Sequence, residues 1–259
     1  MPRRSTTTDS AGRGPSVIEN TVAILRCFAP DRQELGVSEI APKVGLHKST
    51  VSRILASLER EGIVEQGASR RYRLGLGIIA IAGPLLADLD VRRAGYSILQ
   101  DLTEATGETS ALMVWNGSES ITVEQIPSSH QVKHTSSLGS RYQTALSASV
   151  QVFLSGEDAD RTRELIDGGI VRGLGDAPAA DDYLHRLAEV AKRGYAVNYA
   201  ETSPEEVGVA APICDHRGAI VAAVLIPAPR FRVDEDCVVS LGESCMKAAH
   251  HVTLRLGGH

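Results

Sequence analysis

A stripe of small polar and basic side chains between residues 47 and 60 has the composition and spacing needed to contact nucleic acid. Its members recur at helical spacing: Ser49, Ser52, Arg53, Ala56 and Arg60. Small side chains let a helix approach the edges of bases, and an arginine can form two hydrogen bonds with a guanine edge. We therefore predict that the helix carrying this stripe lies in the major groove of double-stranded DNA.

The opposite face of the same helix predicts how the stripe is held. Val51, Ile54, Leu55 and Leu58 occupy positions i, i+3, i+4 and i+7, which is the pattern of a helix with one buried face. The helix is therefore expected to run from about His47 to Arg60, with these apolar residues in a core.

A shorter helix and a basic hairpin flank this element. Ser38 is the expected N-cap of a helix that ends before Gly45, where glycine permits a sharp turn. After the recognition helix, residues 63–66 and 70–74 have the pattern of two strands joined by a turn at 67–69, with Arg70 and Arg71 near its tip. A short helix, a turn, a small-polar helix and a basic hairpin, in this order, predict a winged helix-turn-helix.

The distribution of charge agrees with a DNA-binding module at the N-terminal end. The formal net charge of the 259 residues is −5, but residues 1–76 contain 12 Lys and Arg against 8 Asp and Glu, and residues 77–259 contain 15 against 24. A locally basic module followed by an acidic body is expected when only the first part meets phosphates.

The rest of the chain predicts an α+β domain. The expected helices cover 91–106, 147–154, 181–193 and 233–256, and the expected strands cover 110–115, 121–126, 132–135, 195–199, 207–214 and 219–226. Between the two domains, the apolar run of residues 77–90 predicts a linker helix with a kink or break at Gly83–Pro84. The expected organisation is a disordered arm at 1–15, a winged helix-turn-helix domain at 16–76, the linker helix, and a C-terminal domain at 91–259.

Four segments together resemble the IclR family of bacterial transcription regulators, over about residues 15–256. They are HKSTVSRILASLEREGIV (47–64) with RRYRLGLG (70–77), GETSALMVWNG (107–117), AEVAKRGYAV (188–197) and VGVAAPICDHRGAIVAAVLIPAP (207–229). The resemblance implies a GAF-like effector-binding domain after the linker helix. It also implies a dimer or tetramer whose affinity for a DNA operator changes when a small organic acid binds.

The resemblance and the residue pattern together give two sets of candidate site residues. The candidate DNA contacts are His47, Lys48, Ser49, Thr50, Ser52, Arg53, Arg70 and Arg71. The candidate effector contacts are Met113, Trp115, Asn198, Gly208, Leu225 and Pro227.

The effector region departs from the family pattern at several of these positions. Where the family has an acidic residue, this chain has Asn198, and where it has a cysteine or a similar residue, this chain has Gly208. Leu225 and Pro227 replace the paired serines of the last strand. The usual T-A-x-G-K-A segment is replaced by Ser147–Val152. Fewer hydroxyl donors, more space and more apolar surface favour a larger, more apolar effector, such as an aromatic acid, and such a regulator is expected to control a catabolic operon.

The alternative functions are an enzyme, a redox-responsive regulator and a regulator that needs no effector. No nucleophile elbow, P-loop, HExxH motif or paired-carboxylate spacing indicates an enzyme, and no cofactor or metal site is expected. The four cysteines show no C-x-x-C pairing, so buried reduced thiols in a cytoplasmic protein are expected, while a redox-responsive regulator stays an alternative. A regulator that binds DNA without any effector is the other alternative. No apolar run approaches the length of a membrane span, so no membrane partner is expected.

Overall fold

The computed structural model describes residues 16–29, 32–88, 90–174 and 179–259. The chain divides into two compact units, one ending at Asp88 and the other beginning at Leu89. The arm expected at residues 1–15 lies outside the described residues.

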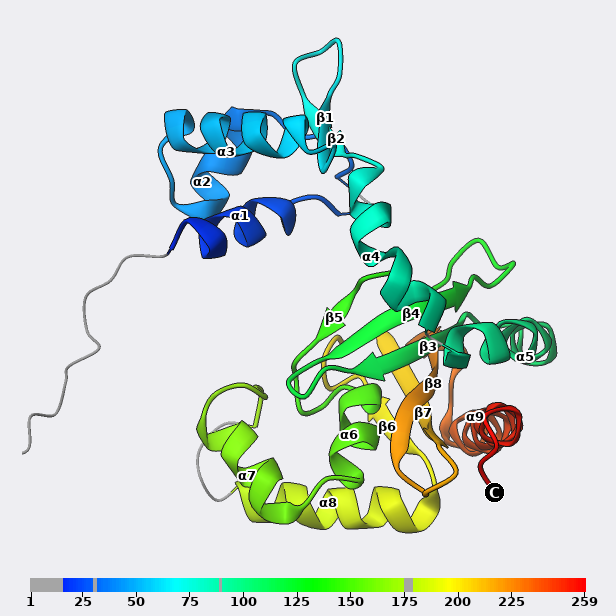
Figure 1. Ribbon diagram of the computed structural model, residues 1–259. Helices are drawn as coiled ribbons and strands as arrows, with labels where there is room; N and C mark the ends of the chain where they lie inside the picture. Colours follow the sequence, from blue (N-terminus) through cyan, green and yellow to red (C-terminus); the bar gives the residue numbers. More distant parts are fainter. Residues whose placement is uncertain (1–15, 30–31, 89, 175–178) are drawn as a thin grey trace, which may run out of the picture. The chain divides into compact units, whose positions relative to one another are not determined.

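The first unit is a winged helix-turn-helix (Figure 1). Ile24, Ile40, Val51 and Leu55 are fully buried in its core. Its elements are α1 (Val17–Leu25), α2 (Val37–Val44), α3 (Lys48–Arg60), β1 (Val64–Gln66), β2 (Tyr72–Leu74) and α4 (Gly77–Asp88).

The turn between α2 and α3 forms as the sequence predicts, but the start of α2 does not. Gly45 ends α2 in the left-handed conformation, with φ +66°, and His47 is the N-cap of α3. The expected N-cap Ser38 lies inside α2, and Gly36 is the N-cap instead. Its backbone N–H donates to Glu39 Oε2 at 2.8 Å, so the carboxylate at the third helical position sets the start of the helix.

The linker helix α4 continues through Gly83–Pro84, so of the expected kink or break, a break is absent. Its surface is almost wholly apolar: Leu76, just before the helix, and Ile79, Ile81 and Leu85 within it are each more than half exposed. Among the described side chains of this helix, so much exposed apolar surface is unusual on a single chain in water.

The second unit is a six-stranded antiparallel sheet with helices on both faces. Its elements are α5 (Asp90–Thr106), β3 (Ser110–Trp115), β4 (Ser120–Ile126), β5 (Arg141–Tyr142), α6 (Ala148–Ser155), α7 (Ala159–Asp167), α8 (Ala179–Arg193), β6 (Ala196–Tyr199), β7 (Glu206–Cys214), β8 (Ile220–Pro229), a 3-10 turn (Arg230–Arg232) and α9 (Glu235–Arg255). The strand order is β5-β4-β3-β8-β7-β6.

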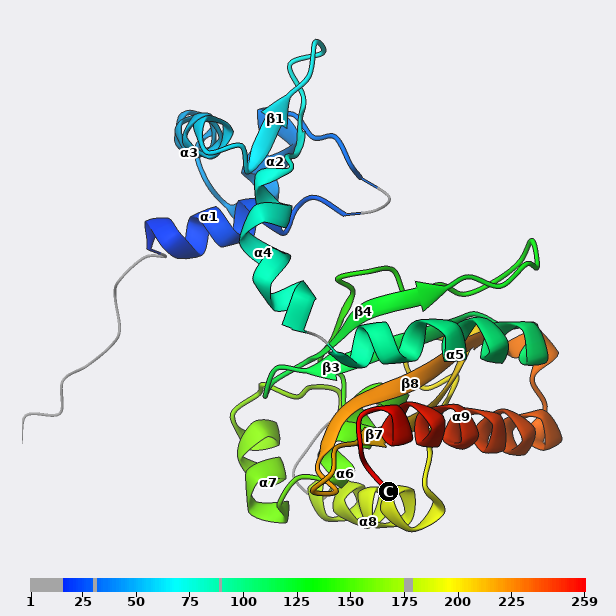
Figure 2. The same ribbon diagram turned by 45° about the vertical axis from the view of Figure 1, so that its right-hand side comes forward.

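Two helix layers cover the two faces of the sheet (Figures 1 and 2). Helices α5 and α9 lie side by side on one face, where Leu99, Leu112, Val224 and Val252 form a fully buried core. Helix α6 covers the other face, backed by α8. Because β7 and β8 are central and covered on both sides, they are continuous apolar runs rather than alternating ones.

The prolines of the central strands lie where a neighbouring strand has ended. Strand β8 pairs with β3 only over residues 223–225, so Pro227 and Pro229 lie beyond that ladder. Pro212 of β7 likewise lies beyond the pairing with β6, which ends at Ala210. A residue without an N–H is tolerated where one side of the strand has no partner.

Three features of this unit differ from the sequence prediction, one of which is the short strand β5 (Arg141–Tyr142), where no strand was predicted. Residues 132–135 are not a strand: the Val132 carbonyl accepts from the Arg232 side chain at 2.9 Å instead of from a neighbouring strand, and the Lys133 side chain bonds the Ser128 carbonyl at 2.7 Å. Helix α7 was not predicted; Asp158 caps it and only Thr162 and Leu165 of it are buried.

Among the described residues, no helix is long and apolar enough to cross a membrane.

Helix α9 approaches the sheet unit closely at one glycine, which yields a test of the packing. A Cβ at Gly242 would lie 2.6 Å from the ring of Tyr195, whose face is covered by the Arg193 guanidinium at 4.3 Å. We expect Gly242→Ala to destabilise the unit by about 1–3 kcal/mol, because overpacking outweighs the roughly 1 kcal/mol that alanine contributes to a helix. Thermal unfolding measures this, and the exposed neighbour Glu243→Ala is the control, with a change within about 0.5 kcal/mol. A stability equal to that of the native chain would contradict the close approach.

Candidate functional site

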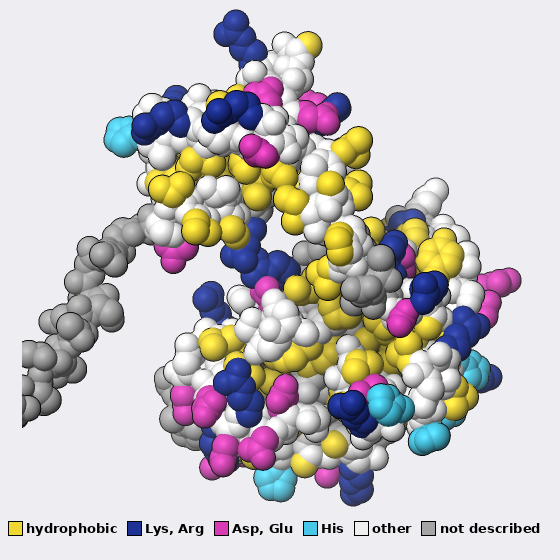
Figure 3. Space-filling view, viewed as in Figure 1, with side chains coloured by type: hydrophobic (Ala, Val, Ile, Leu, Met, Phe, Trp, Pro, Cys, Tyr) yellow, Lys and Arg dark blue, Asp and Glu magenta, His cyan; other side chains and the backbone are white. Residues whose placement is uncertain are grey.

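The predicted DNA-contacting stripe is on the surface of the first unit. Lys48, Ser49, Ser52 and Arg53 are exposed and Thr50 is half-buried. His47 is exposed at the N-cap of α3. Lys and Arg side chains lie along α3 in Figure 3.

The buried face of α3 fixes the direction of this stripe. Val51 and Leu55 are fully buried against α1, α2 and β1, while Ile54 and Leu58 are half-buried on the side toward α1. A helix held by its core face cannot rotate, so the residues on its other face present a fixed pattern of donors.

The two wing arginines of the prediction have different surroundings. Arg70 is exposed at the tip of the hairpin, in the left-handed conformation with φ +59°. Arg71 lies between the hairpin and α2: its guanidinium bonds Glu39 at 2.9 Å and the Glu34 carbonyl at 3.0 Å. The Gly36 N–H and this guanidinium hold the pKa of the Glu39 carboxyl below its usual value. Arg71 therefore fastens the wing to α2, and Arg70 is the better placed of the two to reach a phosphate.

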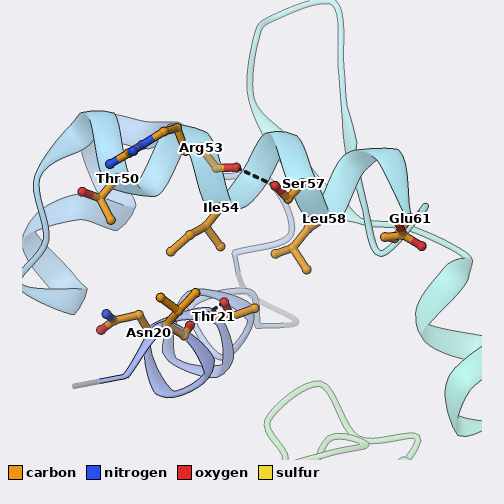
Figure 4. Close-up of a pocket in the computed structure, with 9 residues that line it drawn as sticks. Asn20, Thr21, Thr50, Arg53, Ile54, Ser57, Leu58 and Glu61 are labelled. Carbon is orange, nitrogen blue, oxygen red and sulfur yellow. Dashed lines mark hydrogen bonds between the residues drawn. The ribbon is translucent and has the colours of Figure 1, made fainter.

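An apolar groove of about 450 Å³ runs between α1 and α3 (Figure 4). Ile54 and Leu58 point from α3 toward α1, and Thr21 and Asn20 of α1 face them. Its remaining lining residues are Val17, Thr50, Arg53, Ser57 and Glu61. Val17 and Ile18 of α1 are about three-quarters exposed, so α1 also contributes to the exposed apolar surface of the first unit.

In the second unit, four of the six predicted effector contacts lie together on the face of the sheet that α6 covers. Asn198, Gly208 and Pro227 are partners across β6, β7 and β8. A Cβ at Gly208 would lie 3.8 Å from Leu225 Cδ1 and 3.7 Å from Ala148 Cβ. The first residue of α6 therefore faces this group of four.

Asn198 has few hydrogen-bonding positions left for a ligand. Its Oδ1 accepts from the N–H groups of Glu201 and Thr202 at 3.0 and 3.3 Å, and its Nδ2 donates to Thr202 Oγ1. Its role in this structure is to close the turn after β6.

Met113 and Trp115 lie farther along the same face of the sheet. Trp115 stacks on Phe153, in the last turn of α6, with ring centroids 5.5 Å apart, whereas Gly208 faces the first turn. Met113 Sδ accepts from Thr122 Oγ1 at 3.5 Å. The length of α6 therefore separates Trp115 from the group around Gly208.

The candidate effector residues named from the sequence do not include the first turn of α6. Ser147 is its N-cap but its side chain makes no cap hydrogen bond, and residues 148–150 are buried. The N–H groups of a first turn have no partner within the helix, and together they favour an anion. The position of Ser147–Val152 in place of T-A-x-G-K-A was the signal that could have indicated it.

The four cysteines are free thiols, and the pKa of each is raised. Burial is the main cause for Cys27, Cys214 and the fully buried Cys245, and a hydrogen bond with Asp234 is the main cause for Cys237. A raised pKa lowers the fraction of reactive thiolate. This disfavours the redox-responsive alternative.

Comparison with family models identifies both units. Residues 17–68 match the IclR helix-turn-helix domain, and residues 84–254 match the bacterial transcriptional regulator IclR C-terminal domain. The chain belongs to the IclR family. It is accordingly a DNA-binding transcriptional regulator rather than an enzyme, as the sequence predicts.

The matches to IclR-type regulators cover from 65% to 93% of this chain. The HTH-type transcriptional regulator KipR of Bacillus subtilis is 28% identical and covers 93% of this chain and 96% of its own. A solved domain of an IclR family regulator is 61% identical over 65% of this chain and 97% of its own, with a TM-score of 0.63. An IclR homolog from Microbacterium hydrocarbonoxydans, solved in complex with 4-hydroxybenzoate, is 22% identical, covers 93% of this chain and 98% of its own, and has a TM-score of 0.76, which shows a shared fold.

The placement of Arg53 and Lys48 on an IclR-type recognition helix predicts different roles for them. Arg53 lies mid-face and Lys48 at the helix start, so we expect Arg53 to bond a base edge and Lys48 a phosphate. Arg53→Ala should cost about 1–3 kcal/mol on the operator and relax its specificity. Lys48→Ala should weaken binding to all sequences alike and reduce the salt slope by about one.

Fluorescence anisotropy with operator and random DNA at several salt concentrations separates these effects. Arg26→Ala, at the end of α1, is the control for loss of one positive charge in the same unit. Equal losses on operator and random DNA for Arg53→Ala would contradict its assignment to a base.

Proposed function

We propose that this regulator binds an apolar acid with an aromatic ring at the first turn of α6, and that the acid controls its affinity for the operator of a catabolic operon. The observation that carries the proposal is the uncapped first turn of α6, buried against Gly208 and Leu225. We place the regulator in the cytoplasm, where its DNA lies.

The first turn of α6 supplies the anchor for a carboxylate. An ionised carboxylate buried without donors costs several kcal/mol. Since Asn198 bonds its own turn, and Leu225 and Pro227 bring no side-chain donor, the backbone N–H groups at residues 148–150 are the donors best placed to receive it.

The surroundings of this anchor favour an apolar body for the ligand. Leu225, Ala210 and Met113 belong to one buried apolar cluster with Ala148 and Phe153. The IclR homolog complexed with 4-hydroxybenzoate is a relative of the same fold that holds a ring-bearing acid. We therefore take 4-hydroxybenzoate and benzoate as the first ligands to test here.

A regulator that binds DNA without an effector is the second candidate function. The close packing at Gly208 favours it: a Cβ there would already lie in ordinary contact, 3.7–3.8 Å, with Ala148, Asn198 and Leu225. An effector would have to displace some of this packing, and a protein whose site stays closed would bind no acid.

Calorimetry with a panel of acids distinguishes the two. We expect the native chain to bind aromatic acids more tightly than pyruvate or glyoxylate, because the apolar surroundings reward burial of the ring by about 25 cal/mol per Å². Gly208→Ala adds only a Cβ in ordinary contact and should leave binding close to native, whereas Gly208→Leu should abolish it by filling the same space. Binding that survives in Gly208→Leu, or tighter binding of pyruvate than of the aromatic acids, would contradict the proposed site.

We also propose that the regulator is a homodimer or homotetramer, assembled in part through the apolar surface of its first unit. Figure 3 shows hydrophobic side chains gathered over α1 and α4. They include Val17, Ile18, Leu76, Ile79, Ile81 and Leu85, each more than half exposed. One recognition helix reads few base pairs, so a second copy on a pseudo-palindromic operator supplies the missing specificity.

A charge placed on α4 tests this assembly. Ile81→Asp should weaken self-association and operator binding together, since a buried unpaired carboxylate costs several kcal/mol at an interface. Sedimentation velocity measures the association, and Leu254→Asp, at a half-exposed leucine of α9, is the control. A native chain that is monomeric while bound tightly to its operator would rule the assembly out.

A further inference from the structure

A junction of polar side chains lies directly behind the first turn of α6, on the side of α8. We propose that Arg186 of α8 is a positioning residue for effector binding: it holds the first turn of α6 and the turn after β6 in register without touching the ligand. The proposal rests on the proposed function, in which the first turn of α6 receives the carboxylate.

The guanidinium of Arg186 joins three separate segments. Its Nε donates to Gln151 Oε1 at 2.9 Å, and its Nη2 donates to the Val197 carbonyl of β6 at 2.9 Å. Its Nη1 and Nη2 bond the two carboxylate oxygens of Glu201 at 2.7 and 2.6 Å. Four polar contacts thus come from one planar group, which a lysine ammonium cannot reproduce in the same geometry.

Gln151 transmits this contact to the first turn of α6. Its side chain is fully buried, and its Nε2 donates to the Leu146 carbonyl at 2.9 Å and to the Val197 carbonyl at 3.3 Å. Leu146 comes just before the N-cap Ser147. The amide of Gln151 therefore fixes both the chain entering α6 and the distance from α6 to β6.

Glu201 transmits the contact to the other wall of the effector region. Its backbone N–H donates to Asn198 Oδ1 at 3.0 Å, and Asn198 is the cross-strand partner of Gly208. Ala200, within the same turn, has φ +58°, a conformation that side chains rarely adopt. A turn with a residue in this region persists when its surroundings hold it, and the Arg186–Glu201 pair is one such restraint.

The polar junction around Arg186 is buried at Gln151, on the side of α6, and partly exposed to solvent at Arg186 and Glu201. Arg186 and Glu201 are each about one-third exposed, to a cleft of about 400 Å³ that Glu189, Arg193 and Tyr199 also line. A substitution of Arg186 therefore leaves the apolar core filled. Its consequence is the loss of the hydrogen bond to the Gln151 side chain. This separates a positioning role from a purely structural one.

The test compares Arg186→Lys with the native chain in two measurements. In calorimetry with 4-hydroxybenzoate and benzoate, we expect about a ten-fold loss of affinity, as for other groups that orient a binding element from behind it. In hydrogen exchange followed by mass spectrometry, without any acid, we expect faster exchange confined to residues 146–152 and 198–202. DNA affinity without acid should stay native. Arg163→Lys is the matched control, because Arg163 bonds Asp181 of α8 at 2.7 Å in an exposed pair that does not reach Gln151.

Each result decides a separate question. Native affinity for the acids in Arg186→Lys, or unchanged exchange at residues 146–152, would overturn the role of Arg186 while leaving the effector site in place. Exchange that rises equally in α9 would show that Arg186 only stabilises the unit and would overturn the proposal as well. If the native chain binds none of the acids, the proposed function fails, and the exchange of residues 146–152 alone decides whether Arg186 positions this turn.

Discussion

The burial of α6 is the constraint on which the second unit depends. Residues 148–154 are all buried between the sheet and α8, including the amide of Gln151. A buried helix must satisfy its polar groups from within the protein, since an unmade hydrogen bond costs about 1–3 kcal/mol. The Arg186 guanidinium meets that need for Gln151, and the first turn of α6 keeps donors in the interior, toward Gly208 and Leu225. Burial of α6 therefore has two consequences. Its polar side chains need partners within the protein, and the N–H groups of its first turn favour an anion.

In the DNA-binding unit, too, one face of a helix is packed in the core and the opposite face is exposed. Val51 and Leu55 fix α3 in the core, and the Arg71–Glu39 pair fixes the wing against α2. The residues left exposed, Lys48, Ser49, Ser52 and Arg53 on α3 and Arg70 on the wing, carry donors for bases and phosphates. In both units, then, an arginine bonds within the protein to an element for which we propose a partner.

The sequence predicted those parts of the structure that depend on local periodicity. The two faces of α3 could be predicted because a core face and a small-polar face recur at the same helical period within thirteen residues. The segment at 132–135 could not, because the Val132 carbonyl accepts from the distant Arg232 side chain rather than from a neighbouring strand. The separation of Trp115 from Gly208 depends on how α6 crosses the sheet, and the Arg186–Gln151 bond joins residues 35 positions apart. No periodicity in one sequence reports such pairings. The sequence therefore could not show which of the candidate effector residues lie together, and their contact with an effector stays a prediction.

Coupling between acid and DNA is measured most directly by linkage. The operator is selected from a random DNA pool, and its dissociation constant is measured by anisotropy at fixed salt, without acid and with a saturating concentration of the acid that binds tightest in calorimetry. The affinity of the acid is then measured for the free protein and for the operator complex. If the first turn of α6 is the regulatory site, the operator dissociation constant changes by about 5–150-fold and the acid dissociation constant changes by the same factor. An acid that binds tightly yet leaves operator affinity unchanged would contradict the account.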